Sequence, residues 1–332
     1  MSEKILVEAK HLVKNFDSEH IFGGKKDIVH AVSDVSLRIR EGETLALVGE
    51  SGCGKSTLGR LLLRMIEPTS GTLQFEDTEI SSLSPAKMRE YTKQMQFIFQ
   101  DPYASLDPRM TVFSIIAEPL VTHKVCANKA ELRAKVVELM KTVGIRPEFI
   151  NRYSYQFSGG QRQRIGIARA IALNPKFIVC DEPVSALDVS IQSQILNLLK
   201  DLQKQKGLTY LFISHDLGVV RYISNRVCVM FLGKICEIGD TEDIYSQPLH
   251  PYTKFLLDAV PTTDLSRRNT PKPLLSGEIP SPVNPPSGCR FHTRCPYAKP
   301  VCSEREPEMQ EVDGRLVACH FPGCFQNKPK AE

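Results

Sequence analysis

Short apolar runs along the chain predict buried strands. Residues 44–48 (Thr-Leu-Ala-Leu-Val) form a continuous run, a pattern typical of a strand covered on both faces, and residues 177–180 and 208–213 have the same character. Residues 32–40 roughly alternate between apolar and polar positions and stop at a Glu-Gly turn, and residues 72–75 form a further strand after a glycine. These runs predict the strands of a packed sheet.

Helical patterns separate these strands. Residues 56–65 predict a helix directly after the first buried run, and residues 130–143 place apolar side chains at helical spacing up to a glycine that ends the pattern. Residues 108–175 are mostly helical in character. Strands that alternate with helices predict an α/β fold with a mostly parallel sheet covered on both faces.

The composition changes near residue 261. Residues 261–287 are rich in Pro, Ser and Thr and lack apolar periodicity, which predicts an extended linker, and a cysteine-rich tail follows. We therefore expect one domain at residues 1–260, with a helical subdomain at about 101–175, and a separate C-terminal region at residues 261–332.

The overall composition is that of an ordinary globular protein, with 42% apolar and 24% charged residues in a chain of 332. The net charge is only +4, and the basic residues form no long block, so charge does not favour a nucleic-acid partner. The N-terminus lacks a secretory pattern. No stretch approaches the roughly 20 apolar residues that a spanning helix needs, so any membrane function would require other chains to cross it.

The 10 cysteines are distributed unevenly along the chain. Five are scattered in mostly apolar surroundings, and five crowd the C-terminal end (Cys289, Cys295, Cys302, Cys319 and Cys324). In a chain without an export signal, such a cluster indicates metal binding before it indicates disulfides.

A phosphate-binding loop follows the first buried strand. The motif G-x-x-x-x-G-K-[ST] is complete and lies between a strand and a helix, as its function requires; its residues are Gly49, Glu50, Ser51, Gly52, Cys53, Gly54, Lys55, Ser56 and Thr57. Its glycines let backbone N–H groups point at phosphate oxygens, and the following helix adds the positive end of its dipole. We expect Lys55 to reach the β- and γ-phosphates of ATP and Ser56 to bind Mg²⁺. The residue Cys53 is expected to be a small filler.

A second acidic site ends the strand at residues 177–180. Asp181 follows directly, at the strand end where a parallel sheet presents its ligands, and would hold Mg²⁺ through water. Glu182 should point differently, toward the γ-phosphate, and would polarise the attacking water as a general base. An apolar run followed by Asp-Glu is common in proteins. The phosphate loop upstream is what favours a nucleotide-binding role for this one.

Residues 157–164 (Phe-Ser-Gly-Gly-Gln-Arg-Gln-Arg) distinguish this chain from other phosphate-loop proteins. They resemble the signature sequence of ABC transporter ATPases. A serine and two glycines open a helix with an apolar stripe (Ile165, Ala168 and Ile171), which makes an anion-binding helix N-terminus. The resemblance implies that this site (Ser158, Gly159, Gly160 and Gln161) contacts the nucleotide of a partner subunit, so that two chains close on two ATP molecules.

Three further motifs follow the family order. The resemblance implies that Gln100 links the metal and the attacking water to the helical subdomain, that Asp188 lies in a loop communicating across the dimer, and that His215 contacts the γ-phosphate. An aromatic residue should stack on adenine, and the candidate is Phe16, with Phe22 as the alternative. The implied fold is a RecA-like phosphate-loop NTPase core with an antiparallel β subdomain, a helical ABC subdomain and a cysteine-rich C-terminal extension.

The C-terminal part resembles the oligopeptide and dipeptide importer ATPases. The resemblance rests on residues 250–253 (His-Pro-Tyr-Thr), 277–282 (Gly-Glu-Ile-Pro-Ser-Pro) and 288–296. Residues 100–106 and 282–286 look more like the F-type second ATPase subunit of such importers. This implies a heterodimer with a second ATPase subunit, two transmembrane permease subunits and, indirectly, an extracytoplasmic peptide-binding protein. It also implies a peripheral position at the cytoplasmic face of the cell membrane.

The cysteine spacing C-x5-C-x6-C-x16-C matches no common zinc pattern. Four thiolates suit a [4Fe–4S] cluster, and the family resemblance implies one, with the candidate ligands Cys289, Cys295, Cys302 and Cys319. The fifth cysteine is expected outside the set, although it would be able to replace Cys319. Zinc, with His292 and His320 nearby, and a site without metal are the alternatives.

Two alternatives to peptide import remain open. Related ATPases move nickel or sugars, and the ATPase does not touch the cargo, so the sequence says little about it. A redox-sensing iron–sulfur ATPase is a second alternative. A soluble ABC ATPase acting on ribosomes or DNA is disfavoured, because there is one phosphate loop and no sustained heptad repeat.

Overall fold

The computed structural model describes residues 4–18, 27–260 and 277–326. The described residues form two compact units. The first contains residues 39–43 and 75–213 with the start of the chain up to Val7, and the second contains residues from 8–38, 44–74 and 214–332. In the described part of the chain, no helix is both long enough and apolar enough to cross a membrane.

Parallel strands form the centre of the first unit. Strand β7 (Phe177–Asp181) pairs with β6 (Met95–Ile98) on one side and with β8 (Thr209–Ile213) on the other. Every residue of β7 and β8 is buried. The two predicted strands are therefore confirmed, and β7 continues one residue further than expected, to Asp181. The short strand β5 (Thr78–Glu79) and helix α2 (Pro85–Tyr91) also belong to this unit.

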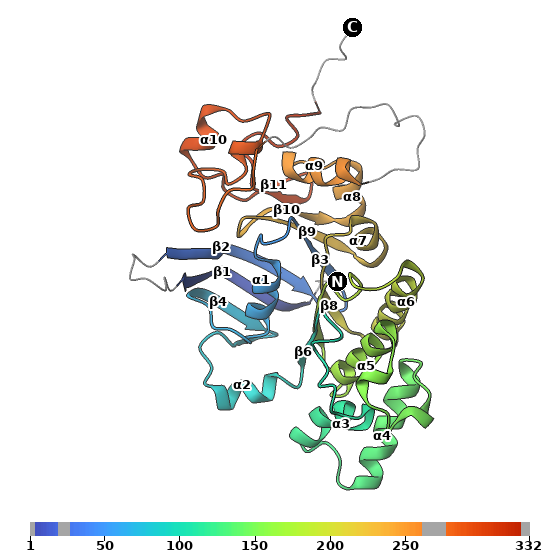
Figure 1. The fold of residues 1–332 in the computed structure, drawn as a ribbon. Coiled ribbons are helices and arrows are strands. Elements are labelled where there is room, and N and C mark those ends of the chain that lie inside the picture. The colour runs from blue at the N-terminus through green and yellow to red at the C-terminus, as the bar shows by residue number, and fades with distance from the viewer. Residues whose placement is uncertain (1–3, 19–26, 261–276, 327–332) are drawn as a thin grey trace. The chain divides into compact units, whose positions relative to one another are not determined.

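Helices form the rest of the first unit. Figure 1 shows α3 (Val112–Thr122), α4 (Lys129–Thr142) and α5 (Gly159–Ile171) packed together. Helix α4 begins one residue before the predicted start, because the Asn128 side chain caps it by accepting a hydrogen bond from the backbone N–H of Glu131 at 2.9 Å. The predicted stripe of α5 is confirmed, since its three members are all buried. Two 3-10 turns, Pro147–Phe149 and Ser154–Gln156, and helix α6 (Val189–Lys206) complete the unit.

The second unit contains a sheet that joins the phosphate-loop strand to the C-terminal tail. Strand β3 (Thr44–Val48), buried at all five positions, runs parallel to β9 (Arg226–Phe231). Strand β9 pairs antiparallel with β10 (Lys234–Asp240), which pairs in turn with the tail hairpin of β12 (Arg315–Val317) and β11 (Gln310–Val312). Backbone hydrogen bonds therefore hold part of the cysteine-rich tail against the strands that position the phosphate loop.

A separate group of strands lies in the order β2-β1-β4, formed by β1 (Ile5–Ser18), β2 (Asp27–Arg40) and β4 (Ser70–Phe75). The predicted alternation is confirmed in β2, where buried and exposed positions alternate from Ser33 to Ile39. The strand begins earlier than predicted, at Asp27. The backbone N–H of Ser33 donates to the carbonyl of Gly233 at 2.8 Å, which ties β2 to the turn between β9 and β10.

Helix α1 (Lys55–Leu62) follows the phosphate loop and ends three residues before the predicted position. The chain leaves the helix because Arg64 adopts a left-handed conformation with φ of 54°. The N–H of Arg64 donates to the carbonyl of Leu61 at 2.8 Å, and the N–H of Met65 donates to the carbonyl of Arg60 at 2.9 Å. This is the Schellman closure, which usually has glycine at the left-handed position.

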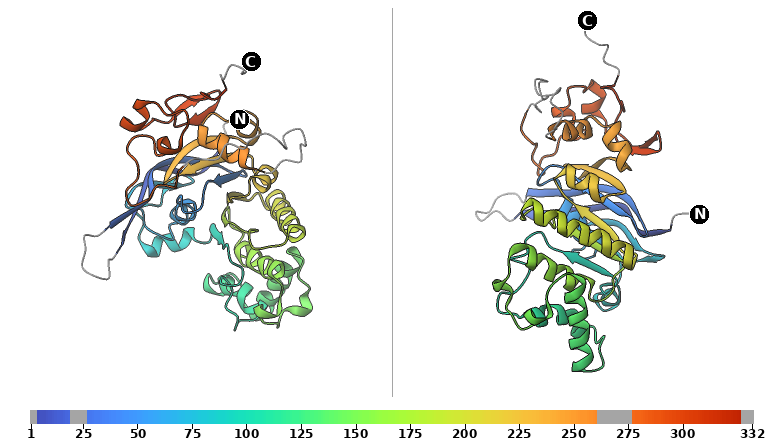
Figure 2. Two further views of the ribbon diagram at one scale, coloured as in Figure 1. Left: turned by 45° about the horizontal axis from the view of Figure 1, so that its top comes forward. Right: turned by 90° about the vertical axis from the view of Figure 1, so that its right-hand side faces the viewer.

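The described part of the second unit contains four more helices: α7 (Leu217–Ile223), α8 (Thr241–Ser246), α9 (Pro251–Ala259) and, in the tail, α10 (Pro300–Glu304). Figure 2 shows α8 and α9 beside β10, in agreement with their contacts. Phe291 from the tail packs on Phe231 and Tyr252, with ring centroids 5.3 and 5.2 Å apart. The tail thus shares an aromatic core with β9 and α9. The predicted linker is free of helix and strand at 277–287, and its earlier part lies outside the described residues.

Candidate functional site

The phosphate loop curves tightly between β3 and α1 because its glycines adopt backbone angles closed to other residues. Gly49 has φ of 153°, and a Cβ atom there would lie 2.1 Å from the carbonyl oxygen of Met230. Gly54 has φ of 104°, and its Cβ would lie 2.1 Å from the carbonyl oxygen of Ala31. Neighbouring backbone therefore fills the space that a side chain would need, which explains the glycines.

Lys55 is the first residue of α1, and it is 5% exposed. Its Nζ donates to the carbonyl oxygens of Gly49 and Glu50, both at 2.8 Å. The ammonium group is therefore held over the start of its own loop. The first turn of a helix leaves backbone N–H groups without intrahelical acceptors, and the Gly54 cap brings no side-chain hydrogen bond. This combination of N–H groups and a lysine suits a phosphate group.

The other loop positions differ in their burial. Cys53 is buried, and burial raises the pKa of its thiol above the ordinary value. The neutral thiol agrees with a filler role for this side chain. Ser56 and Thr57 are half-buried, whereas Ser51 and Gly52 are exposed at the tip of the loop.

The acidic pair lies at the end of β7. Asp181 is the last residue of the strand and is buried, and Glu182 follows in a left-handed conformation with φ of 45°. Its N–H donates to the carbonyl of Ile213 in β8 at 3.0 Å, which holds the bend. A bulky residue held in this sparsely populated region marks a place where the surrounding structure dictates the backbone. The backbone therefore changes direction between the two acids.

Gln100 meets this acidic pair. It lies two residues beyond β6, and its Nε2 donates to Oε2 of Glu182 at 3.0 Å. Strands β6 and β7 are parallel neighbours with Ile98 opposite Cys180, so residues two positions further along both strands fall side by side. The structure therefore brings two of the three predicted catalytic side chains into contact.

The signature helix has a reciprocal cap. The Ser158 hydroxyl accepts from the N–H of Gln161 at 3.4 Å, and the Gln161 side chain accepts from the N–H of Ser158 at 3.1 Å. A Cβ on Gly160 would lie 2.3 Å from Cγ2 of Ile191, the third residue of α6. The glycine thus allows α5 to approach α6 closely. The side chains of Ser158 and Gln161 are exposed and remain accessible to a second chain.

The remaining predicted residues lie at the ends of elements. Asp188 is exposed at the N-terminus of α6, directly after a loop that Gln192 holds by donating to the carbonyls of Val184 and Leu187 at 3.0 Å. His215 is exposed, two residues after β8. Phe16 in β1 is 40% exposed, with Nζ of Lys14 5.0 Å from its ring centroid. The alternative Phe22 lies outside the described residues.

These site residues are divided between the two units. The phosphate loop, His215 and Phe16 belong to the second unit, and the first contains the remaining ones: Gln100, Ser158 to Gln161, Asp181, Glu182 and Asp188.

All five tail cysteines line one cavity of the second unit. The same cavity is bordered by His250, His292, His320 and Phe321. The N–H of Cys289 donates to the carbonyl of Cys302 at 2.8 Å, which brings together two parts of the cluster. Cys324, expected outside the set, lines the cavity together with the other four. Burial raises the pKa of the Cys295 and Cys319 thiols to about 12.

Each of the two tail histidines forms a hydrogen bond to a backbone carbonyl. Nδ1 of His292 donates to the carbonyl of Cys289 at 2.9 Å, and Nε2 of His320 donates to the carbonyl of Arg305 at 2.8 Å. Over the described ranges, no three His, Cys, Asp or Glu side chains are arranged to hold a single metal ion. Both histidines thus border the cysteines with one ring nitrogen already hydrogen-bonded.

Sequence reasoning missed one contact of the phosphate loop. Nη1 of Arg294, in the tail, donates to Oε2 of Glu50 at 2.8 Å. The N–H of Glu50 also donates to the hydroxyl of Tyr252 at 2.8 Å. Both partners stand in strings that identify the C-terminal region, so the signal was present, but it did not indicate which loop they contact.

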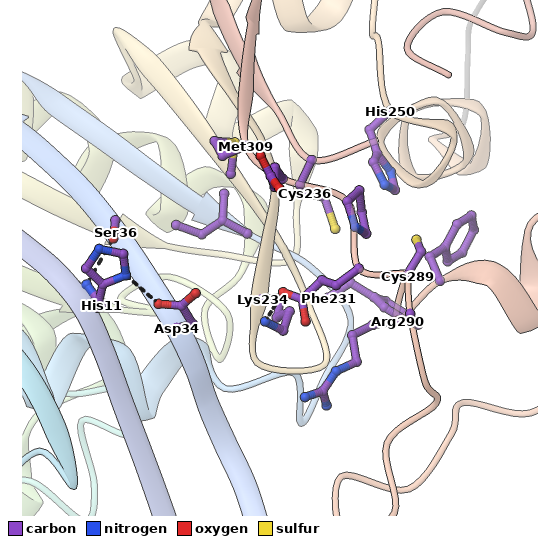
Figure 3. Close-up of a pocket in the computed structure, with 17 residues that line it drawn as sticks. His11, Asp34, Ser36, Phe231, Lys234, Cys236, His250, Cys289, Arg290 and Met309 are labelled. Atoms are coloured by element: carbon purple, nitrogen blue, oxygen red, sulfur yellow. Dashed lines mark hydrogen bonds and ion pairs between the residues drawn. The ribbon is translucent and has the colours of Figure 1, made fainter. Parts of the chain in front are cut away.

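A second cavity of about 450 Å³ lies beside the tail (Figure 3). Its polar walls are largely self-paired, with His11 Nδ1 2.7 Å from Oδ1 of Asp34, and with Lys234 in an ion pair with Glu306. Arg290 is the exception, because its Nη1 is buried without a hydrogen-bond partner. None of the predicted nucleotide-site residues lines this cavity.

Known proteins match the chain over nearly its whole length. A family model described as ABC transporter matches residues 32–185, and one described as Oligopeptide/dipeptide transporter, C-terminal region, matches residues 236–302. A putative oligopeptide transport ATP-binding protein, YkfD of Bacillus subtilis, is 54% identical over 98% of each chain. The oligopeptide transport ATP-binding protein AppF of the same organism is 52% identical, over 96% of this chain and 98% of that protein.

Solved structures match the fold. The dimeric ATP-binding cassette MJ0796 bound to ADP and phosphate superposes with a TM-score of 0.64 at 29% identity, over 71% of this chain and 99% of that one. CbiO1 of Clostridium perfringens, part of the transporter complex cbiONQ, gives 0.63 at 26% identity, over 74% and 92%. These matches confirm the predicted phosphate-loop core with its antiparallel β subdomain. The chain therefore belongs to the ABC transporter ATP-binding proteins of the oligopeptide/dipeptide transporter family.

Proposed function

We propose that this chain hydrolyses ATP to energise the import of di- and oligopeptides. The observation that carries the proposal is the match to the oligopeptide/dipeptide C-terminal region, together with relatives named as oligopeptide transport proteins along the full chain. ATP and Mg²⁺ are the ligands typical of ABC ATPases, and the phosphate loop and the contact between Gln100 and Glu182 support this chemistry.

We assign the roles in hydrolysis residue by residue. Lys55 binds the β- and γ-phosphates, and Ser56 and Asp181 hold Mg²⁺, the latter through water. Glu182 accepts the proton of the attacking water, and Gln100 holds its carboxylate in place through the 3.0 Å hydrogen bond. His215 contacts the γ-phosphate, and Phe16 stacks on adenine. Charge on the transferring group is stabilised by preorganised donors.

The proposed working unit contains a second ATPase subunit and two transmembrane permease subunits at the cytoplasmic face of the membrane, with an extracytoplasmic peptide-binding protein that supplies cargo. The exposed signature residues Ser158 and Gln161 then contact the nucleotide of the partner, and Asp188 communicates across the dimer. Hydrolysis removes the γ-phosphate that held the two halves together, and they separate.

We also propose that Cys289, Cys295, Cys302 and Cys319 hold a [4Fe–4S] cluster, with Cys324 as the alternative to Cys319. The residues present fit this group, since all five line one cavity. Each thiolate of such a cluster binds a different iron, so the sulfurs need not converge on a single ion. Zinc would need that convergence, and no three such side chains converge in the described part of the chain. A bound cluster would supply a structural clamp or a one-electron redox centre.

Transport in reconstituted vesicles tests the function. The heterodimer, its permeases and the neighbouring binding protein are placed in liposomes, and ATP hydrolysis is measured with the binding protein loaded with dipeptide, oligopeptide, nickel or a sugar. Stimulation and uptake with peptides alone support the proposal. Stimulation by nickel or a sugar instead would establish the alternative cargo. ATP turnover that responds to oxidation but to no cargo would favour the redox-sensing ATPase.

A further inference from the structure

We infer that Arg294 of the cysteine-rich tail is a positioning residue for the phosphate loop, which it holds through the carboxylate of Glu50 in a conformation suited to ATP. The inference rests on the proposed nucleotide role of this loop. It extends that role by making a tail residue part of the machinery that sets ATP affinity.

The ion pair itself is close and shielded from solvent. Nη1 of Arg294 lies 2.8 Å from Oε2 of Glu50, and the two side chains are 7% and 22% exposed. The other buried nitrogen of this guanidinium, Nε, has no hydrogen-bond partner. Glu50 is therefore the acidic partner on which the buried charge of Arg294 depends, and loss of either residue leaves the other unpaired away from water.

Glu50 is held at three points. Its carboxylate accepts from Arg294, its N–H donates to the hydroxyl of Tyr252 at 2.8 Å, and its carbonyl accepts from Nζ of Lys55 at 2.8 Å. It also directly follows Gly49, where an added Cβ atom would lie 2.1 Å from the carbonyl oxygen of Met230. A shift of the Glu50 side chain would therefore be transmitted to the loop backbone and to the lysine that binds phosphate.

Hydrogen bonding and packing within the tail also hold Arg294 in place. Arg294 ends the 3-10 turn His292–Arg294, and its N–H donates to the carbonyl of Phe291 at 3.0 Å. Phe291 is 1% exposed and packs on Tyr252, the residue that holds the other side of Glu50. Cys289 and Cys295, which flank this segment, both line the cysteine cavity. The packing thus connects the cysteine cavity to the phosphate loop through one turn of chain.

A purely structural role predicts a different result from a positioning role. If Arg294 only stabilises the tail, its loss lowers the melting temperature and the amount of folded protein, but the folded fraction binds ATP normally. If it positions the loop, the folded protein binds MgATP more weakly while chemistry at Glu182 is unaffected. The Michaelis constant for ATP then rises, and the turnover number stays constant.

The experiment uses the assembled ATPase subunits and permeases and compares Arg294→Gln, Glu50→Gln and the double variant with wild type. We expect each single variant to raise the Michaelis constant for MgATP about tenfold and to change the turnover number less than about twofold. The double variant should be no worse than either single one, because both remove the same interaction. Arg294→Lys should restore part of the affinity.

The matched control is Arg305→Gln. It removes the same charge from the same tail, but its partner Glu308 is exposed, so ATP affinity should match wild type. Equal Michaelis constants for wild type and Arg294→Gln, or strictly additive effects in the double variant, would overturn the inference. If Arg294→Gln does not fold, Glu50→Gln decides, because it keeps the arginine and the tail intact. Failure of peptide stimulation in wild type would concern the proposed function alone, since ATP affinity is measured independently.

Discussion

Gln100 and Glu182 are 82 residues apart in the chain, yet the amide of one donates to the carboxylate of the other at 3.0 Å. Each lies two residues beyond a member of the last register pair, Ile98 of β6 and Cys180 of β7, so the register of these parallel strands sets the contact. The left-handed backbone at Glu182 then turns the carboxylate away from the strand. This relationship makes the general-base assignment open to direct test.

Replacing the carboxylate of Glu182 by an amide should stop turnover without preventing ATP binding. Glu182→Gln keeps the shape of the side chain and its ability to contact Gln100, but it cannot accept a proton. We expect the turnover number to fall by about 10²–10⁴-fold. Nucleotide binding is measured by equilibrium dialysis, and hydrolysis by phosphate release. Glu138→Gln, at an exposed position of α4, serves as the control with the same chemical change. Hydrolysis at the wild-type rate by Glu182→Gln would sink the assignment.

Two glycines of α5 should respond in opposite directions to alanine. A Cβ at Gly160 would meet Ile191 at 2.3 Å, whereas a Cβ at Gly166 has no neighbour within 4 Å. Gly160→Ala should lower the free energy of unfolding by about 1–3 kcal/mol because of overpacking. Gly166→Ala should raise it by about 0.5–1 kcal/mol because alanine favours the helix interior. Chemical denaturation of both variants checks this pair.

The two-residue explanation for Gly160 can be tested further. Adding Ile191→Ala to Gly160→Ala removes the atom that the new Cβ would meet, and it should recover part of the lost stability. No recovery in the double variant would mean that the close approach of α5 to α6 is not what requires this glycine.

Cys53 should behave as an inert filler of the phosphate loop. Its side chain is buried, and burial raises the pKa of its thiol, so little reactive thiolate forms near neutral pH. Labelling with a maleimide, followed by peptide mapping, should modify the half-buried Cys126 before Cys53. Cys53→Ser should retain ATP turnover within about twofold. Preferential labelling of Cys53 would show that the loop exposes a reactive thiol.

The tail cysteines should bind iron. Protein purified without oxygen should be brown and contain close to four iron and four sulfide per chain if the proposed cluster forms. Cys295→Ser should lose most of this iron, and Cys126→Ser, outside the cavity, should retain it. Comparing Cys319→Ser with Cys324→Ser identifies the fourth ligand, because both line the cavity. A colourless protein with one zinc per chain would contradict the cluster and show that the cysteines bind zinc.

Several elements and motifs of this protein could be predicted from the sequence alone, because they depend on residues that are close together in the chain. The buried run at 44–48 predicted β3 because a strand covered on both faces must be apolar throughout. The phosphate-loop motif predicted both glycine positions that the backbone demands, and Ser158 with the two glycines after it predicted the start of α5. The end of α1 was misplaced, because its left-handed closure uses Arg64 and no glycine marks it.

Contacts between distant segments were decided by the tertiary structure. Arg294 and Glu50 are 244 residues apart, and nothing in either segment indicates the other. The same is true of the five cysteines, whose spacing suggested a cluster but did not place Cys324 in the cavity. The sequence determined the elements and the phosphate chemistry, since these depend on neighbours along the chain. Only packing determined that the tail reaches the phosphate loop, because strand pairing and the shared aromatic core bring together residues that local patterns cannot relate.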